Sequence, residues 1–172
     1  MISLVLVICS SAGMTQSRRL PAEQNTFGLE GPELQHPATL SDEELAALAS
    51  DELMRKELDQ DPPIPKLTRE GLEAAVIHLH GPAERDLVVI GYGSPLIGTN
   101  VGPFWIIRDL PSGPKVVLST IALGITIRKA TFGGFRNIEG FAATAVTGTT
   151  VDFHFKGKKY VEYKVRSGPL GQ

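Results

Sequence analysis

The chain has 172 residues, and its 19 acidic and 17 basic side chains leave a formal net charge of −2. With 42% apolar residues, it has the composition of a globular protein, one domain plus some additional chain. The single cysteine excludes a disulfide scaffold within the chain and a zinc site built from several thiolates. No apolar run reaches the roughly 18–20 residues that a membrane-spanning helix needs, so we expect no membrane span.

The first 13 residues have the features of a secretory leader. An apolar run over residues 2–9 precedes four small residues, and cleavage after Ala12 or Gly13 satisfies the small-x-small rule. Residues 1–13 are therefore predicted to be a signal peptide and the protein to be periplasmic or extracellular. Two alternatives are a lipid anchor at Cys9, where Ile8 replaces the small residue expected before it, and a buried N-terminal strand.

Residues 14–40 contain three prolines and two glycines without a sustained apolar period, which predicts a flexible tether. A helical segment is predicted to follow over residues 41–82. Ser41 and Glu44 form a capping box, in which each side chain can bond the other residue's backbone amide, so a helix should begin there. A second helix is predicted from about Thr68, where apolar residues recur at helical spacing as far as Leu79.

Short β-rich runs separated by turns occupy residues 83–168, and residues 169–172 form a tail. The connections are too short for parallel crossovers, so the strands should form an antiparallel β-meander of six or seven strands. The predicted fold class is α+β, with two N-terminal helices before the meander. The expected strands are residues 87–92, 104–109, 115–120, 124–131, 139–146, 150–156 and 160–166.

Charge divides at the same place as the fold. Residues 1–85 carry 7 basic and 14 acidic side chains, whereas residues 86–172 carry 10 basic and 5 acidic ones. One interpretation is that the acidic helical half docks on the basic sheet half. The other is that the basic sheet faces an anionic partner.

Motifs for nucleotide or metal cofactors are incomplete. Gly91-x-Gly93 follows an apolar strand, but Leu96 stands where a dinucleotide fingerprint has its third glycine. The acidic residues around Asp51 follow helical rather than calcium-loop spacing. His78 and His80 would point apart on a helix, although on a strand they would share a face and could join His154 in a zinc site. We expect no cofactor and no metal site.

Catalytic constellations are equally sparse. No serine lies in a nucleophile elbow, although Ser94, Ser119 or Ser167 could in principle meet His154 in the folded chain. A small exported hydrolase that uses His154, with Asp152, as acid/base is therefore the alternative function.

Five basic residues alternate with aromatic residues near the C-terminus, a pattern that could suit single-stranded nucleic acid. However, Phe153 and Phe155 share a strand face with Val151, which predicts that they belong to the core. We expect no nucleic acid partner. An anionic envelope polymer and an acidic protein surface both remain possible partners. The basic residues are Lys156, Lys158, Lys159, Lys164 and Arg166.

Two short motifs carry a family resemblance. Residues 134–138 (Gly-Phe-Arg-Asn-Ile) and 155–160 (Phe-Lys-Gly-Lys-Lys-Tyr) resemble a turn and a hairpin of uncharacterised bacterial exported proteins. Those proteins resemble a single antiparallel, blade-like β domain, and the likeness covers Leu87 to Val165. The resemblance implies a β-meander and brings no catalytic residues with it.

The expected function is that of an exported, non-enzymatic binding or inhibitor-like module that engages a protein or a cell-envelope polymer. Its contacts are expected at sheet edges and loops. The candidate binding residues are Tyr92, Phe135, Arg136, Lys158 and Lys159.

The last hairpin has a predicted register. Apolar side chains of its two strands meet on one face when paired residue numbers sum to 316, with a loop over residues 157–159. A sum of 314 would oppose Asp152 to Glu162, two like charges. The predicted pairs are Phe155 with Val161, Phe153 with Tyr163, Asp152 with Lys164 and His154 with Glu162.

Overall fold

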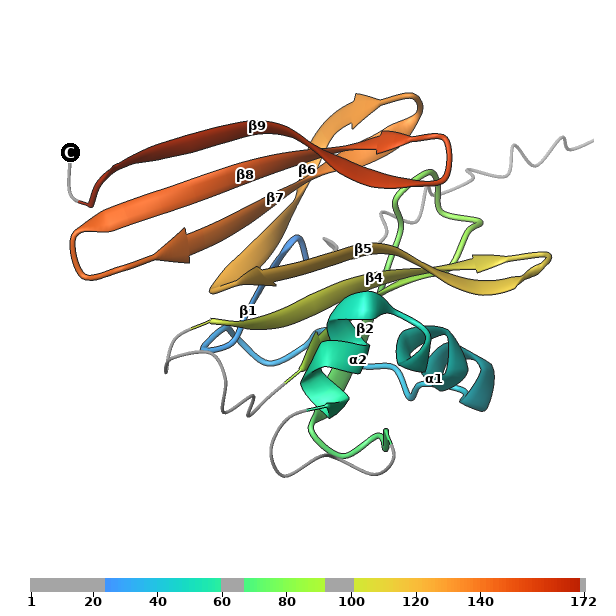
Figure 1. The fold of residues 1–172 in the computed structure, drawn as a ribbon. Coiled ribbons are helices and arrows are strands. Elements are labelled where there is room, and N and C mark those ends of the chain that lie inside the picture. Colours follow the sequence, from blue (N-terminus) through green and yellow to red (C-terminus); the bar gives the residue numbers. More distant parts are fainter. Residues whose placement is uncertain (1–23, 60–66, 92–100, 171–172) are drawn as a thin grey trace, which may run out of the picture.

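The computed structural model describes residues 24–59, 67–91 and 101–170, which form two antiparallel sheets and two short helices (Figure 1). One sheet has the strand order β2-β3-β4-β5 and the other the order β1-β6-β7-β8-β9. The elements are β1 (Thr26–Gly28), α1 (Asp42–Ala49), α2 (Glu52–Leu58), β2 (Leu72–Ile77), β3 (Asp86–Gly91), β4 (Gly102–Leu110), β5 (Gly113–Ala122), β6 (Gly124–Phe132), β7 (Phe135–Ala143), β8 (Thr147–Lys156) and β9 (Lys159–Pro169).

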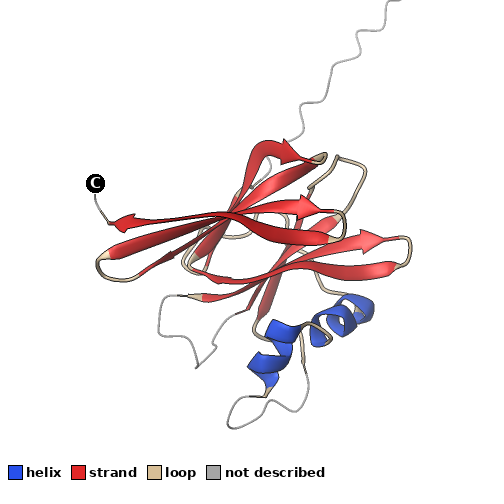
Figure 2. Ribbon diagram, turned by 45° about the horizontal axis from the view of Figure 1, so that its top comes forward, coloured by secondary structure: helices blue, strands red, loops and turns tan. Residues whose placement is uncertain are grey.

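The elements form three layers: the five-stranded sheet, the four-stranded sheet in the middle, and the helices (Figure 2). Strand β3 lies inside this arrangement, and all six of its residues are buried. Val88 and Ile90 face the other sheet, whereas Leu87 and Val89 face the helices. A strand covered on both faces is apolar throughout rather than alternating, which explains the continuous run in β3.

Each pair of adjacent layers encloses its own apolar core. The larger core lies between the sheets and includes Phe27, Phe104, Ile106, Ile138 and Phe153. The smaller core lies between the middle sheet and the helices, where Trp105 packs with Leu48 and Met54.

The prediction of a second helix from Thr68 is wrong, because residues 72–77 form strand β2. Ala75 and Ile77 pack into the core between the sheets, and Ala74 packs into the core beneath the helices. Because both faces of β2 are covered, β2 has apolar residues at consecutive positions. Some of these residues also match the spacing of one face of a helix, which explains the wrong prediction. The helical segment predicted for residues 41–82 therefore contains only α1 and α2.

The tether prediction is also wrong for residues 24–40, while residues 14–23 lie outside the described part of the chain. Strand β1 pairs with β6, and Phe27 is only 1% exposed. Further along, the Ala38 amide donates to the Ala74 carbonyl at 2.8 Å, and the Val76 amide donates to the His36 backbone carbonyl at 2.9 Å. This segment therefore supplies the backbone partners of β2 and closes the edge of the middle sheet.

The capping box at the start of α1 is confirmed. The Ser41 hydroxyl accepts from the Glu44 amide at 3.2 Å, and the Glu44 carboxylate accepts from the Ser41 amide at 2.7 Å. The same carboxylate accepts from Arg85 at 2.6 Å and is nearly fully buried, so the cap also attaches α1 to the middle sheet.

The fold is mostly antiparallel β with two short helices, which agrees with the expectation in outline, but both helices precede residue 60 and the strands do not form one meander of six or seven strands. Strand β5 belongs to the middle sheet and β6 to the other, and only Leu123 separates them. A Cβ on Gly124 would lie 2.7 Å from the Phe27 carbonyl oxygen, so the crossing between sheets needs a glycine there. A one-residue connection resembles a hairpin in sequence, which is why the change of sheet was not predicted.

The predicted register of the last hairpin is confirmed in part. Asp152 pairs with Lys164, but a bulge follows, and His154 pairs with Val161 and Phe155 with Tyr160. The three remaining predicted pairs are wrong, because Tyr163 is the extra residue of the bulge and the connection contains only residues 157–158. Burial of Tyr160 against Phe155 favours this register, and Gly157, at φ 66°, allows the tighter turn.

Candidate binding surface on the open sheet

The five-stranded sheet has one face packed on the middle sheet and one face that no described helix or strand covers (Figure 1). We call the uncovered side the open face. Phe153 and Phe155 of β8 point into the core, so Asp152 and His154, which alternate with them, point to the open face. Lys164, opposite Asp152, shares that side.

Three rings stack on the open face, and we call them the aromatic stack. His154 lies between Phe132 of β6 and Tyr163 of β9, with ring centroids 4.8 and 4.0 Å away. Tyr163 is 64% exposed and Phe132 is 45% exposed. The stack is therefore an apolar feature presented to solvent, and the bulge in β9 brings Tyr163 onto His154.

Two buried polar atoms have no hydrogen-bond partner in the described part of the chain: Nδ1 of His154, in the stack, and Oδ1 of Asn137, in β7. Asn137 precedes Ile138 in β7, and Ile138 pairs with Phe153, the residue before His154. A buried polar atom without a partner costs stability.

Ion pairs occupy the centre of the open face. Glu139 accepts from Arg128 and, at 3.1 Å, from Arg166, which also binds both carboxylate oxygens of Asp152. These four charges neutralise one another across β6, β7, β8 and β9. The net charge of the open face therefore comes from the lysines around them.

The protein is slightly acidic as a whole, but its basic side chains are concentrated in this outer sheet. Residues 124–170 carry eight basic and three acidic side chains, whereas residues 41–59, which form the helical layer, carry two basic and seven acidic ones. No ion pair within the described residues involves Lys129, Lys156, Lys158, Lys159 or Lys164.

The acidic helices do pack on strands of the second half of the chain, but on its neutral part and not on its basic one. The helices pack on the middle sheet, whose strands β3 to β5 with their connections have two basic and two acidic residues. The helices cover the apolar outer surface of the middle sheet, which therefore lies between the acidic layer and the basic one, and only α2 borders a recess that β9 also lines.

The predicted binding residues fall in two places. Lys158 and Lys159 are exposed at the β8–β9 turn, whereas Phe135 and Arg136 lie at the junction of the sheets. Phe135 stacks on His80 and Phe155, with centroids at 4.6 and 4.1 Å. Tyr92 lies outside the described residues.

Arg136 acts within the junction. Its guanidinium donates to the Ile127 carbonyl at 3.1 Å and to Asn25, and its backbone amide donates to the Leu79 carbonyl at 2.8 Å. Arg136 therefore holds β6, β7 and the segment that follows β2 together.

A buried ion pair lies beside this junction. Arg108 of β4 donates to Asp86 of β3 at 3.1 Å, and its guanidinium carbon lies 4.4 Å from the Phe135 ring centroid. Burial raises the pKa of Asp86 and outweighs the hydrogen bond from the Leu79 amide and the charge of Arg108. Burial likewise raises the pKa of the Tyr160 hydroxyl, which donates to the Arg136 carbonyl at 2.7 Å.

The residues considered for catalysis do not converge on His154 within the described chain. Ser119 donates to Asp51 at 2.7 Å, Ser167 lies 2.9 Å from the Thr149 hydroxyl, and Ser94 falls outside the described residues. Asp152 is held by Arg166.

His78 and His80 follow β2 rather than lying in a helix, and they bind different groups. Their Nδ1 atoms lie 2.7 Å from the Glu84 carbonyl and 2.9 Å from the Gly134 carbonyl. The part of the chain that the structure describes contains no group of three histidine, cysteine or acidic residues able to hold a metal ion.

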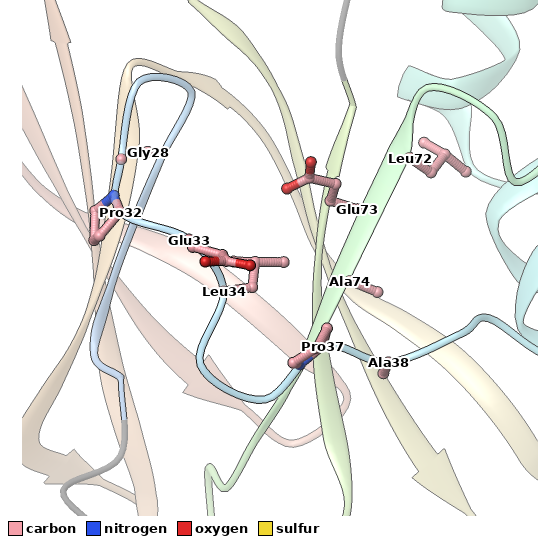
Figure 3. A pocket seen from close by; sticks show the side chains of 10 residues that line it. Gly28, Pro32, Glu33, Leu34, Pro37, Ala38, Leu72, Glu73 and Ala74 are labelled. Carbon is pink, nitrogen blue, oxygen red and sulfur yellow. The ribbon is translucent and has the colours of Figure 1, made fainter.

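Recesses of the surface lie away from the aromatic stack. One of about 460 Å³ separates residues 28–38 from β2, and Glu33 and Glu73 lie on its opposite walls (Figure 3). Another, of about 450 Å³, lies between α2, β5 and β9, with Tyr160 and Glu162 in its lining. A third, of about 540 Å³, lies beside β1 and Phe141.

Over residues 24–59, 67–91 and 101–170, no helix has the length and apolar character required to cross a membrane. The chain forms a two-sheet antiparallel β fold with a helical layer and an open, basic outer sheet. Comparison with protein-family models, with curated proteins and with solved structures finds no match.

Sequence reasoning missed the aromatic stack. Its rings come from three strands, and the bulge that places Tyr163 beside His154 has no clear sequence signal. Phe132 and Phe135 flank the same Gly133-Gly134 turn, yet Phe132 joins the stack and Phe135 packs against the core, so the sequence around the turn does not separate the two roles.

Proposed function

We propose that the protein is an exported, non-enzymatic binding module that engages an anionic partner, a protein or a cell-envelope polymer, through the open face. The observation that carries this proposal is the separation of charge between the layers. The basic sheet is not covered by the acidic helices, so its positive field reaches solvent.

Two further features support the proposal. The aromatic stack supplies exposed apolar area next to Lys156 and Lys164, and apolar groups framed by charge are typical of binding surfaces. The apolar leader over residues 1–13 and the resemblance to exported β-domain proteins support export, although these leader residues lie outside the described part of the chain.

Binding to anionic envelope material tests the proposal. Full-length protein is passed over immobilised envelope extract, separated into protein and polysaccharide fractions, at rising salt concentration. Lys156→Glu with Lys164→Glu should reduce retention strongly, and retention of the wild type should fall with salt, because charge attraction provides the affinity.

Lys115→Glu is the matched control, because Lys115 is an exposed lysine of β5 in the other sheet. It should be retained like the wild type. Equal retention of all three proteins would show that the open face is not the binding surface. Mass analysis of the N-terminus after expression with the leader tests export separately, since cleavage is expected after Ala12 or Gly13.

A further inference from the structure

We propose that the partner is a protein, and that an acidic surface patch with an apolar centre docks on the aromatic stack and the lysines beside it. This inference rests on the proposed function and specifies its partner and its point of contact. The contact would centre on Tyr163 and Phe132, with Lys156 and Lys164 at its rim.

The geometry of the stack excludes insertion of a base or sugar on either side of His154 and leaves only the exposed parts of Tyr163 and Phe132 for contact with a partner. Single-stranded nucleic acid binds by stacking its bases on free aromatic faces. Here both faces of His154 are covered, because the centroids of Phe132 and Tyr163 lie only 4.8 and 4.0 Å away. A ring inserted between two others needs about twice the usual stacking separation, so neither a base nor a sugar can enter this stack without opening it.

The composition of the patch fits a protein interface. Exposed Tyr and Phe supply large apolar area at small entropic cost, and such aromatic residues are enriched at the centres of interfaces. The neighbouring lysines have no acidic partner within the described residues. Acidic side chains at the edge of the partner patch would complement them.

The bulge in β9 directs the partner to the face of the sheet rather than its edge. Tyr163 is the additional residue between Glu162 and Lys164 in the ladder with β8. A bulge and charged side chains along an edge strand both oppose addition of another strand. The same bulge places Tyr163 next to Lys164 on the open face, which combines apolar and basic contacts in one position.

A peptide selection tests the inference. Full-length protein is immobilised and challenged with a display library of random 16-residue peptides. We expect enriched peptides to combine Asp or Glu with aromatic or aliphatic residues. Tyr163→Ala and Lys164→Glu should each weaken binding of a selected synthetic peptide by about tenfold or more. A peptide whose acidic residue is replaced by Lys should recover affinity for Lys164→Glu.

Two control variants keep the test specific. Val146→Ala shortens a residue that is 72% exposed in the turn before β8, and Lys115→Glu reverses a charge on the other sheet. Both should bind the peptide within about twofold of the wild type, as expected for positions outside the contact. Each variant is first shown to retain the wild-type fluorescence of Trp105, which is buried in the smaller core.

Parallel titrations with polygalacturonate and polyphosphate distinguish the partner classes. Saturable polymer binding that requires Tyr163, without peptide binding, would overturn this inference and leave the proposed function standing. If neither peptides nor polymers bind in a way that depends on Tyr163 and Lys164, both this inference and the proposed function are overturned. Light scattering that shows self-association abolished by Lys164→Glu would overturn the inference in favour of a second copy, whose acidic helices would then occupy the face.

Discussion

The indole nitrogen of Trp105 donates to the Asp51 carboxylate at 3.0 Å, which joins the middle sheet to the N-terminus of α2. The same carboxylate accepts from the amides of Leu53 and Met54 and from the Ser119 hydroxyl. Asp51 is thus both the cap of α2 and the polar link between the helical layer and two strands. Because Trp105 is the only tryptophan, its fluorescence reports on this link.

Replacement of Asp51 should destabilise the protein. Asp51→Ala removes the cap and leaves the Trp105 N–H without its partner in a buried position. We expect a loss of about 2–4 kcal/mol in the free energy of unfolding, measured by urea denaturation with Trp105 fluorescence. Asp59→Ala, which alters an exposed acid at the C-terminus of α2, is the control and should change stability little. Equal effects of the two changes would contradict the role of Asp51.

Glu44 predicts a dependence of stability on acid pH. Burial by itself raises the pKa of Glu44, but the Ser41 amide and Arg85 together outweigh it and hold the pKa below its ordinary value of 4.5. The ionised form therefore contributes stability that is fully present above pH 4.5 and is lost as the pH falls through the lowered pKa.

Glu44→Gln isolates this contribution. The variant should be less stable than the wild type at pH 7, because the ion pair with Arg85 is lost, and the difference should narrow below pH 4.5. Urea denaturation of the wild type and the variant at a series of pH values between 7 and 3 measures this difference in the free energy of unfolding. A difference that stays constant across this range would show that Glu44 does not carry the expected pH dependence.

The two tyrosines of β9 should respond differently to removal of their hydroxyl groups. Tyr160 is buried and donates to the Arg136 carbonyl, so Tyr160→Phe should cost about 1–2 kcal/mol. Tyr163 is exposed on the open face, and Tyr163→Phe should change stability by less than about 0.5 kcal/mol. Chemical denaturation of both variants checks the prediction, and a larger effect at Tyr163 would contradict the assignment of the two faces.

The β6–β7 turn should tolerate no side chain at Gly134. This residue has φ 84°, and a Cβ there would lie 3.0 Å from the His80 ring. Gly157 has φ 66° with open space around it. A side chain at either glycine is therefore strained by the positive φ, but only a side chain at Gly134 also meets a neighbouring group. Gly134→Ala should therefore lower the thermal midpoint more than Gly157→Ala. Calorimetry compares them, and equal shifts would mean that His80 moves aside freely.

Local sequence signals predicted local structure well where one interaction dominated. Ser41 and Glu44 predicted the start of α1, because a capping box involves only neighbouring residues. The alternation around Phe153 and Phe155 predicted which side chains enter the core. These signals worked because the chemistry that they describe lies within a few residues of the chain.

The binding surface was predicted less well. Lys158 and Lys159 are exposed at the turn as expected, but Arg136 holds the two sheets together, which its position beside a Gly-rich turn did not indicate. Charge counts located a basic half without showing which side of it meets solvent. That depends on which sheet the helices cover.

The sequence by itself determined a mostly β chain with a capped helix, an apolar β8 face and an acidic first half. Only the tertiary structure decided that residues 72–77 form a strand, that the chain changes sheet at Leu123, and that Tyr163 stacks on His154. The physical reason is that a segment buried on both faces loses its periodicity, and a sheet crossing or a bulge depends on contacts with residues distant in sequence. The open basic face is a product of those distant contacts, since the middle sheet, and not the basic one, receives the helices.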